Sequence, residues 1–174
     1  MIKKMIRIEK AQRPTLDETF LDTYSRTQNI HRMWRKRNGI WVLADEAFVY
    51  DWDLSKKQEV AEDLLSERYI SYVALDGNKV VGFIGLLSHL FDECMVLDYM
   101  HIDQRYRRKG IGSSLFQKAC CIAFSYGASC LYIPACPAEE TIAFYRAMGA
   151  QVSEDVIKEM VREEPSDLQL RKML

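Results

Sequence analysis

The feature that most constrains the fold is a glycine-containing turn, Gln104–Ser113, between an apolar strand-like segment and an amphipathic helical one. Gly110 and Gly112 allow the backbone to approach a ligand closely and to point its N–H groups outward. The N-terminus of the following helix adds partial positive charge, and three basic side chains lie beside it. The turn therefore predicts a pyrophosphate-binding site at a strand-to-helix junction.

Two common nucleotide-binding patterns do not fit this turn. A Walker loop requires GxxxxGK[ST], which is absent, and a dinucleotide fingerprint requires a third glycine where Leu115 stands. A basic helix cap that binds no ligand is the remaining alternative. The preceding strand and the basic side chains favour a phosphate ligand over that alternative.

The turn resembles the coenzyme-binding signature [RQ]xxGx[GA] of the GNAT superfamily of N-acetyltransferases. The residues that match the signature and the longer pattern around it are Ile102, Tyr106, Arg107, Gly110, Ile111 and Gly112. Gln104 replaces the usual proline and Arg108 the usual glycine, and neither change removes a glycine that faces the phosphates. The resemblance extends over about residues 70–150 and implies acetyl-coenzyme A as cosubstrate.

The same resemblance implies which residues contact the coenzyme. The backbone of Met100, His101 and Ile102 is expected to pair with the pantetheine arm as an added strand would. The pyrophosphate is expected on the backbone of Arg107, Arg108, Lys109, Gly110, Ile111, Gly112 and Ser113. Residues 138–149 resemble a later helix of the family, with the pattern N-x-x-A-x-x-F-Y-x-x-x-G-F. Ala138 stands in place of the asparagine, so the hydrogen bond that this asparagine makes to the coenzyme is not expected here.

Acetyl transfer requires a neutral amine, a polarised carbonyl and a proton for the departing thiolate. By its family position, Tyr145 is the candidate acid, with a core tyrosine as the alternative. Asp98 interrupts an apolar run, and a buried acid is costly unless it is paired or used. By alternation it shares a side with Met100 and Ile102. Many GNAT enzymes carry an acid here, so Asp98 is the candidate base or amine anchor.

Two further groups are interpreted as structural. Cys136 suggests an acetyl-cysteine intermediate, but a thiol without an obvious histidine partner is more often inert. His101 points opposite to Asp98 in the strand pattern. The sequence therefore predicts direct attack by the amine in a ternary complex. A non-catalytic acyl-coenzyme A-binding sensor or interaction module is the alternative, and it would tolerate loss of Asp98 and Tyr145.

The remaining segments predict the sheet and its helices. Strands are expected at residues 4–8, 70–75, 79–87, 94–103, 131–133, near 151 and at 168–173. Helices are expected at residues 14–37, 111–126 and 139–148. A further helix is expected to begin after an N-cap at residue 53 or 55. In this prediction the basic run Met33–Arg37 lies at the solvent-exposed C-terminal end of the first helix. Asn38-Gly39 then indicates a turn after that helix. Residues 41–50 suit either the core or a substrate pocket.

This order predicts an α/β fold of the α+β type. Together with the resemblance, it implies a GNAT-like mixed, mostly antiparallel central sheet of about six or seven strands flanked by helices. A parallel strand–helix–strand unit is expected at the acetyl-coenzyme A site. No linker or repeat divides the chain, so residues 1–174 are expected to form a single domain.

Composition limits the partners and the location. The net charge of -1 argues against nucleic acid, and no segment is apolar enough for a membrane. Five irregularly spaced cysteines predict free thiols and a cytoplasmic protein, with Cys94, Cys120, Cys121 and Cys130 buried. No metal is expected, because metal-ligand spacings are missing from the sequence.

The acceptor is expected to be a small-molecule amine or a peptide or protein amine. The acidic residues Asp45, Glu46, Asp51 and Asp53 suit a cationic amine, although a solvated surface is the alternative. An exposed sheet edge near the C-terminus would permit a homodimer.

Overall fold

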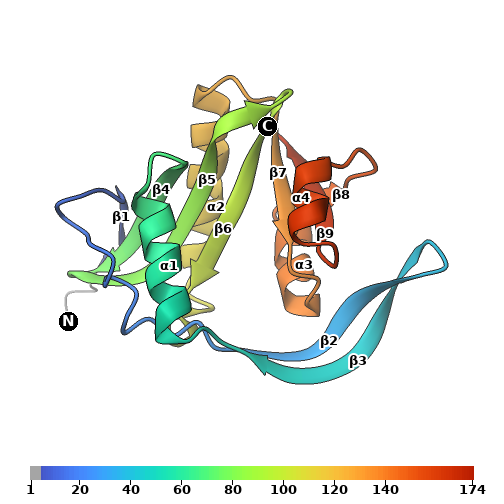
Figure 1. Cartoon of the computed structure of the whole chain (residues 1–174), viewed down its shortest axis with the longest axis horizontal. Coiled ribbons are helices and arrows are strands. Elements are labelled where there is room, and N and C mark those ends of the chain that lie inside the picture. The colour runs from blue at the N-terminus through green and yellow to red at the C-terminus, as the bar shows by residue number, and fades with distance from the viewer. Residues whose placement is uncertain (1–4) are drawn as a thin grey trace.

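The computed structural model of the protein describes residues 5–174, with a seven-stranded sheet at its centre (Figure 1). Its strands are β1 (Arg7–Lys10), β4 (Tyr69–Asp76), β5 (Lys79–Phe91), β6 (Cys94–Ile102), β7 (Cys130–Ala135), β8 (Gln151–Val152) and β9 (Leu168–Met173). They lie in the order β1-β4-β5-β6-β7-β9-β8, and only β6 and β7 are parallel. This confirms the predicted mixed, mostly antiparallel sheet. Of the first predicted strand, residue 4 lies outside the described residues.

Two pairs of helices cover the two faces of the sheet. The helices are α1 (Leu54–Leu65), α2 (Ile111–Ser125), α3 (Glu139–Ala147) and α4 (Lys158–Glu163). α2 and α3 pack on one face through a core that includes Leu115, Phe116 and Ile142. α1 packs on the other face through Val60 and Leu64, and α4 joins that face through Met160. α1, α2 and α3 lie where the sequence predicts helices, whereas α4 was not predicted because six residues show too little periodicity.

The parallel strands β6 and β7 separate soon after they begin. Their pairing covers Cys94–Cys130, Met95–Leu131 and Val96–Tyr132. Just beyond, β6 has a bulge: Tyr99 pairs with Gly85 and Leu97 with Leu86, so Asp98 is an extra residue. Because a bulge bends and twists its strand, β6 turns away from β7 from this point onward.

A long hairpin occupies the segment for which a helix was predicted. Residues 12–24 form successive turns, and β2 (Gln28–Arg37) pairs with β3 (Ile40–Tyr50) through nearly all of its length. Asn38 and Gly39 have φ angles of 49° and 81°, as a tight hairpin turn requires. The predicted turn is therefore confirmed, but the helix before it is wrong and the basic run lies in a strand. Cross-strand pairing outweighs the helical spacing of the earlier apolar residues.

The cysteine prediction is wrong in two respects. Cys94 and Cys130 face each other in the parallel register of β6 and β7, with Cα atoms 4.7 Å apart, and form a disulfide. Cys121 is exposed and Cys120 partly buried. Thirty-six residues separate the bonded pair in sequence, so only the strand order brings these cysteines together. Among residues 5–174, no helix is both long and apolar enough to span a bilayer.

Gly85 tests the packing beside the bulge. A Cβ atom at this position would lie 2.7 Å from a methyl of buried Leu64 and 3.3 Å from the Tyr99 ring. We expect Gly85→Ala to destabilise the protein by about 1–3 kcal/mol through overpacking, which lowers the thermal midpoint by roughly 3–10 °C. In a Leu64→Ala background, the same glycine change should cost less. Equal losses in both backgrounds, measured by thermal unfolding, would contradict this packing.

Candidate functional site

The glycine turn presents free N–H groups at the start of α2. Gly110 is the residue before the first helical turn, with φ 80°, and no side chain caps the helix there. A Cβ atom at Gly110 would meet no atom within 4 Å, so the space above the turn is open. Arg108 also has a positive φ of 62°, and it is exposed. The uncapped N–H groups and the partial charge of a fifteen-residue helix fit a pyrophosphate.

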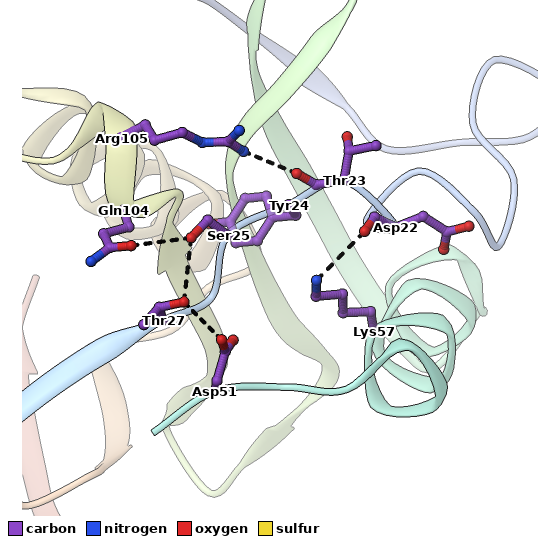
Figure 2. A pocket seen from close by; sticks show the side chains of 9 residues that line it. All are labelled: Asp22, Thr23, Tyr24, Ser25, Thr27, Asp51, Lys57, Gln104 and Arg105. Carbon is purple, nitrogen blue, oxygen red and sulfur yellow. Dashed lines mark hydrogen bonds between the residues drawn. The ribbon is translucent and has the colours of Figure 1, made fainter. Parts of the chain in front are cut away.

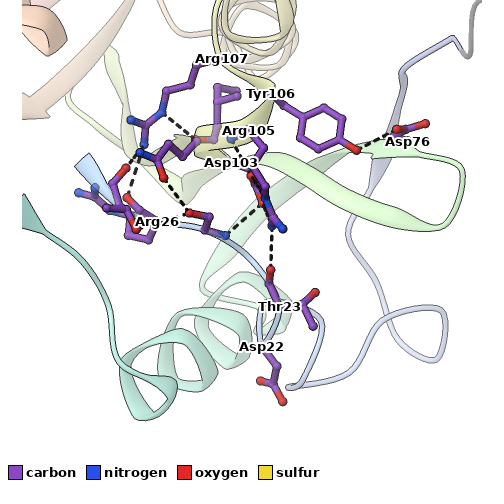
Figure 3. A network of polar contacts seen from close by, with 12 residues as sticks. Asp22, Thr23, Arg26, Asp76, Asp103, Arg105, Tyr106 and Arg107 are labelled. Atoms are coloured by element: carbon purple, nitrogen blue, oxygen red, sulfur yellow. Dashed lines mark hydrogen bonds and ion pairs between the residues drawn. The ribbon is translucent and has the colours of Figure 1, made fainter. Parts of the chain in front are cut away.

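Two basic side chains of the turn bind backbone carbonyl oxygens of the protein, whereas the sequence suggested that they lie beside the phosphates. Arg107 donates to the carbonyl oxygens of Ile102 at 3.2 Å and Thr27 at 2.8 Å, so it ties the start of β2 to the end of β6 (Figure 3). Lys109 donates to the Arg105 carbonyl oxygen at 3.2 Å. The expected pyrophosphate contacts therefore depend on backbone groups, with Arg108 as the exposed cation.

A buried carboxylate holds the chain that precedes β2 against the turn. Asp103 is fully buried, and it accepts hydrogen bonds from the Arg105 guanidinium at 2.6 and 2.9 Å and from the backbone N–H of Ser25 at 3.1 Å. Burial opposes ionisation, but these donors outweigh it and lower the pKa of Asp103 to about 2. Arg105 also donates to the carbonyl oxygen of Thr23 (Figure 3). The carboxylate is therefore ionised and structural.

An open polar hollow of about 300 Å³ lies beside this network (Figure 2). It is lined by Asp22, Thr23, Tyr24, Ser25, Thr27, Asp51, Lys57, Gln104 and Arg105. Its side chains bond largely to one another: the Thr27 hydroxyl donates to Asp51 at 2.7 Å. None of the predicted catalytic or coenzyme-binding residues lines it, but Asp51 of the acidic group suggested for a cationic amine does. Of the acidic group suggested for a cationic amine, Asp53 caps α1 and Glu46 pairs with Arg35, which favours the structural interpretation.

The β6 edge that faces β7 is available where the two strands have separated. Met100, His101 and Ile102 pair with β5 on one side, and the β7 pairing has already ended at Val96. The backbone there can accept a further strand, as a pantetheine arm would require. The His101 ring packs between Trp52 and Phe83, and burial lowers its pKa strongly. This neutral ring supports the structural interpretation of His101.

The hairpin explains the alanine that replaces the family asparagine. Ala138 is fully buried, and it forms a β-bridge with Met33 of β2. Arg32 of the same strand makes a paired contact with Glu139, at 2.5 and 2.8 Å. β2 therefore covers the N-terminus of α3, and a small residue fits beneath it.

Asp98 lies on the other side of the sheet from the one predicted. Met100 and Ile102 pack toward α2, whereas Asp98 accepts a 2.6 Å hydrogen bond from the hydroxyl of Tyr69, a residue of the opposite core cluster. The bulge adds one residue to β6, so the residues before it point to the face opposite the one that simple alternation from Met100 would give. Burial raises the pKa of Asp98, although Tyr69 and Arg68 oppose the change.

Tyr145 is buried, with only 7% of its surface exposed, among the rings of Phe116 and Phe144. Within residues 5–174, no group hydrogen-bonds to its hydroxyl. Burial raises its pKa, and the charges of Cys136 and Asp167 add to the effect. The sequence analysis missed Asp167, which lies directly before β9 and belongs to no motif.

Comparisons with known proteins agree with this geometry. Residues 37–150 match the model of the acetyltransferase (GNAT) family. The structure of nourseothricin acetyltransferase is similar, with TM-score 0.74 and 14% identity over 97% of this chain and 98% of that one. A putative streptothricin acetyltransferase from Bacillus anthracis, in complex with acetyl-coenzyme A, has TM-score 0.71 and 16% identity over 98% and 99%. PaiA N-acetyltransferase from Thermoplasma acidophilum, in complex with coenzyme A, has TM-score 0.63 and 17% identity over 98% and 99%.

No curated protein matches the sequence significantly. The solved structures, all below 20% identity, establish a shared fold. The family model covers more than half of the 174 residues, including the glycine turn and α3. The chain therefore belongs to the GNAT family of acetyltransferases.

Proposed function

We propose that the protein transfers an acetyl group from acetyl-coenzyme A to a primary amine by direct attack within a ternary complex. One observation carries this proposal: two features lie at the place where β6 and β7 separate. They are the uncapped N-terminus of α2 and the unpartnered hydroxyl of Tyr145, a residue of α3. The first suits the phosphates of the cosubstrate, and the second suits a proton donor at its sulfur.

The protein residues supply binding and proton transfer. The N–H groups of Arg107–Ser113 would hold the pyrophosphate, and the backbone of Met100–Ile102 would align the pantetheine arm as a strand. The amine nitrogen attacks the acetyl carbon, and the C–S bond breaks as Tyr145 gives its proton to the sulfur. The tyrosinate then takes the proton that the new amide nitrogen must lose. The Tyr145 hydroxyl remains protonated until this step, because burial and the neighbouring charges of Cys136 and Asp167 raise its pKa.

Direct attack is favoured over an acetyl-cysteine intermediate by the environment of Cys136. Burial raises the pKa of this thiol, so little of it is thiolate at neutral pH. The nucleophile is then the acceptor amine itself. The Tyr145 hydroxyl has no hydrogen-bond partner among residues 5–174, so it is free to donate a proton to a bound ligand, which supports an enzyme over a coenzyme sensor.

Ser113, in the first turn of α2, tests the pyrophosphate site. Ser113→Glu places a carboxylate where the phosphates would lie, yet an acid in a first helical turn suits the folded state. Acetyl-coenzyme A at about a hundred times its dissociation constant should raise the wild-type midpoint by roughly 5–10 °C, whereas ATP and NAD should not. We expect Ser113→Glu to bind at least about tenfold more weakly than the uncharged Ser113→Gln. Equal affinity of the two variants would place the phosphates elsewhere.

Tyr145→Phe tests the proton donor. The hydroxyl has no protein partner within the described chain, so its removal should leave the fold and the midpoint shift with acetyl-coenzyme A intact. The turnover number should fall by about 10²-fold, because the thiolate would leave without general-acid assistance. Tyr126→Phe, at an exposed tyrosine that ends α2, is the matched control and should keep full turnover. Wild-type turnover in Tyr145→Phe would remove this residue from the mechanism.

A further inference from the structure

A second carboxylate lies at the opening between β6 and β7, and it comes from a distant part of the chain. Asp167 directly precedes β9, whose first residue Leu168 pairs with Ala135 at the end of β7. By this antiparallel register, Asp167 is opposite Cys136. It therefore lies where β7 ends and the two parallel strands are already apart.

Asp167 is half-buried and has no counter-ion. Within residues 5–174, no hydrogen bond or ion pair engages its carboxylate. Burial raises its pKa to about 7, and the charges of Glu164 and Asp98 contribute. A carboxylate with a raised pKa accepts a proton more readily than an ordinary aspartate, which suits a base.

The groups around Asp167 come from several elements. The charge of Asp98 on β6 acts on Asp167. Asp98 itself accepts a hydrogen bond from Tyr69, and the charges of Arg68 and Asp63 act on it. Glu164 acts on Asp167 from the preceding loop.

Two further groups lie on the β7 and α3 side. The Asp167 charge acts on the thiol of Cys136 and on the hydroxyl of Tyr145. That hydroxyl belongs to a side chain only 7% exposed and lacks a partner among residues 5–174. An unpartnered hydroxyl on a side chain that is otherwise buried, next to the unpaired Asp167 carboxylate, indicates that a polar ligand completes the site.

We propose that Asp167 accepts the proton of a cationic primary alkylamine acceptor, while Asp98, held by Tyr69, provides the second negative charge that attracts the ammonium group. This inference rests on the proposed acetyl transfer and divides the two roles that the sequence left open for Asp98. Asp167 takes one proton from R–NH₃⁺ and becomes a neutral acid. The free electron pair of R–NH₂ then attacks the acetyl carbon, and the C–S bond breaks as Tyr145 protonates the departing sulfur. The tyrosinate regains a proton from the new amide nitrogen, and Asp167 returns its own proton to water.

The first test does not depend on any acceptor. Carboxyl ¹³C NMR titration of the full chain should show Asp167 titrating near pH 7. Asp98→Asn and, separately, Glu164→Gln should each lower that pKa, because each removes a neighbouring negative charge. An Asp167 that titrates near 4, or that does not respond to Asp98→Asn, would overturn the proposal.

The second test uses kinetics with alkylamines such as spermidine. Asp167→Asn should reduce kcat/KM by about 10²-fold at pH 7, and the loss should shrink as the pH approaches the pKa of the amine. Glu163→Gln, an exposed carboxylate in α4, is the matched control and should keep wild-type kinetics. The midpoint shift with acetyl-coenzyme A should be unchanged in Asp167→Asn.

The outcomes separate the two proposals. A wild-type protein whose midpoint does not respond to acetyl-coenzyme A would contradict the proposed function. Wild-type kcat/KM in Asp167→Asn, a loss that does not vary with pH, or an enzyme that acetylates only amines already neutral at pH 7 would contradict this inference and leave acetyl transfer intact.

Discussion

The site depends on how early two parallel strands stop pairing. β6 and β7 share three residue pairs, and a bulge at Asp98 then turns β6 away. The separation leaves backbone groups of β6 free to bind an extended ligand arm. The bulge has a second effect, because it moves the Asp98 carboxylate to the face opposite Met100. One inserted residue thus creates the opening and decides which side chain borders it.

The N-terminal part of the chain lies outside the central sheet and packs against the glycine turn and α3. Arg107 and Asp103 fasten residues 23–27 to the turn that carries the predicted phosphate site. The β2–β3 hairpin then extends to α3, where Met33 covers Ala138 (Figure 1). Arg107, the cationic residue of the family signature, therefore holds the N-terminal segment in place. The backbone N–H groups of the turn remain available for the ligand.

The sequence supported the central part of the structure because its signals are local. Turn glycines, helix caps and apolar periodicity predicted the strands β4 to β7 and the helices α1, α2 and α3, and the structure confirms them. The helix predicted before Asn38 failed because cross-strand pairing, a non-local interaction, determines residues 28–37. The Cys94–Cys130 disulfide and the face of Asp98 also depend on register. Asp167 had no signal at all, since only the strand order brings it near β6.

The unpaired carboxylate before β9 has a consequence for folding itself. Unfolded, Asp167 would lose its proton near pH 3.8, whereas the folded protein retains that proton up to about pH 7. Between these values the native state binds more protons than the denatured ensemble, so the free energy of unfolding decreases as the pH rises through this range. Proton linkage at this one residue therefore contributes stability in mild acid that is lost as the pH rises toward neutrality, so a half-buried carboxylate without a counter-ion works against the stability of the chain that holds it.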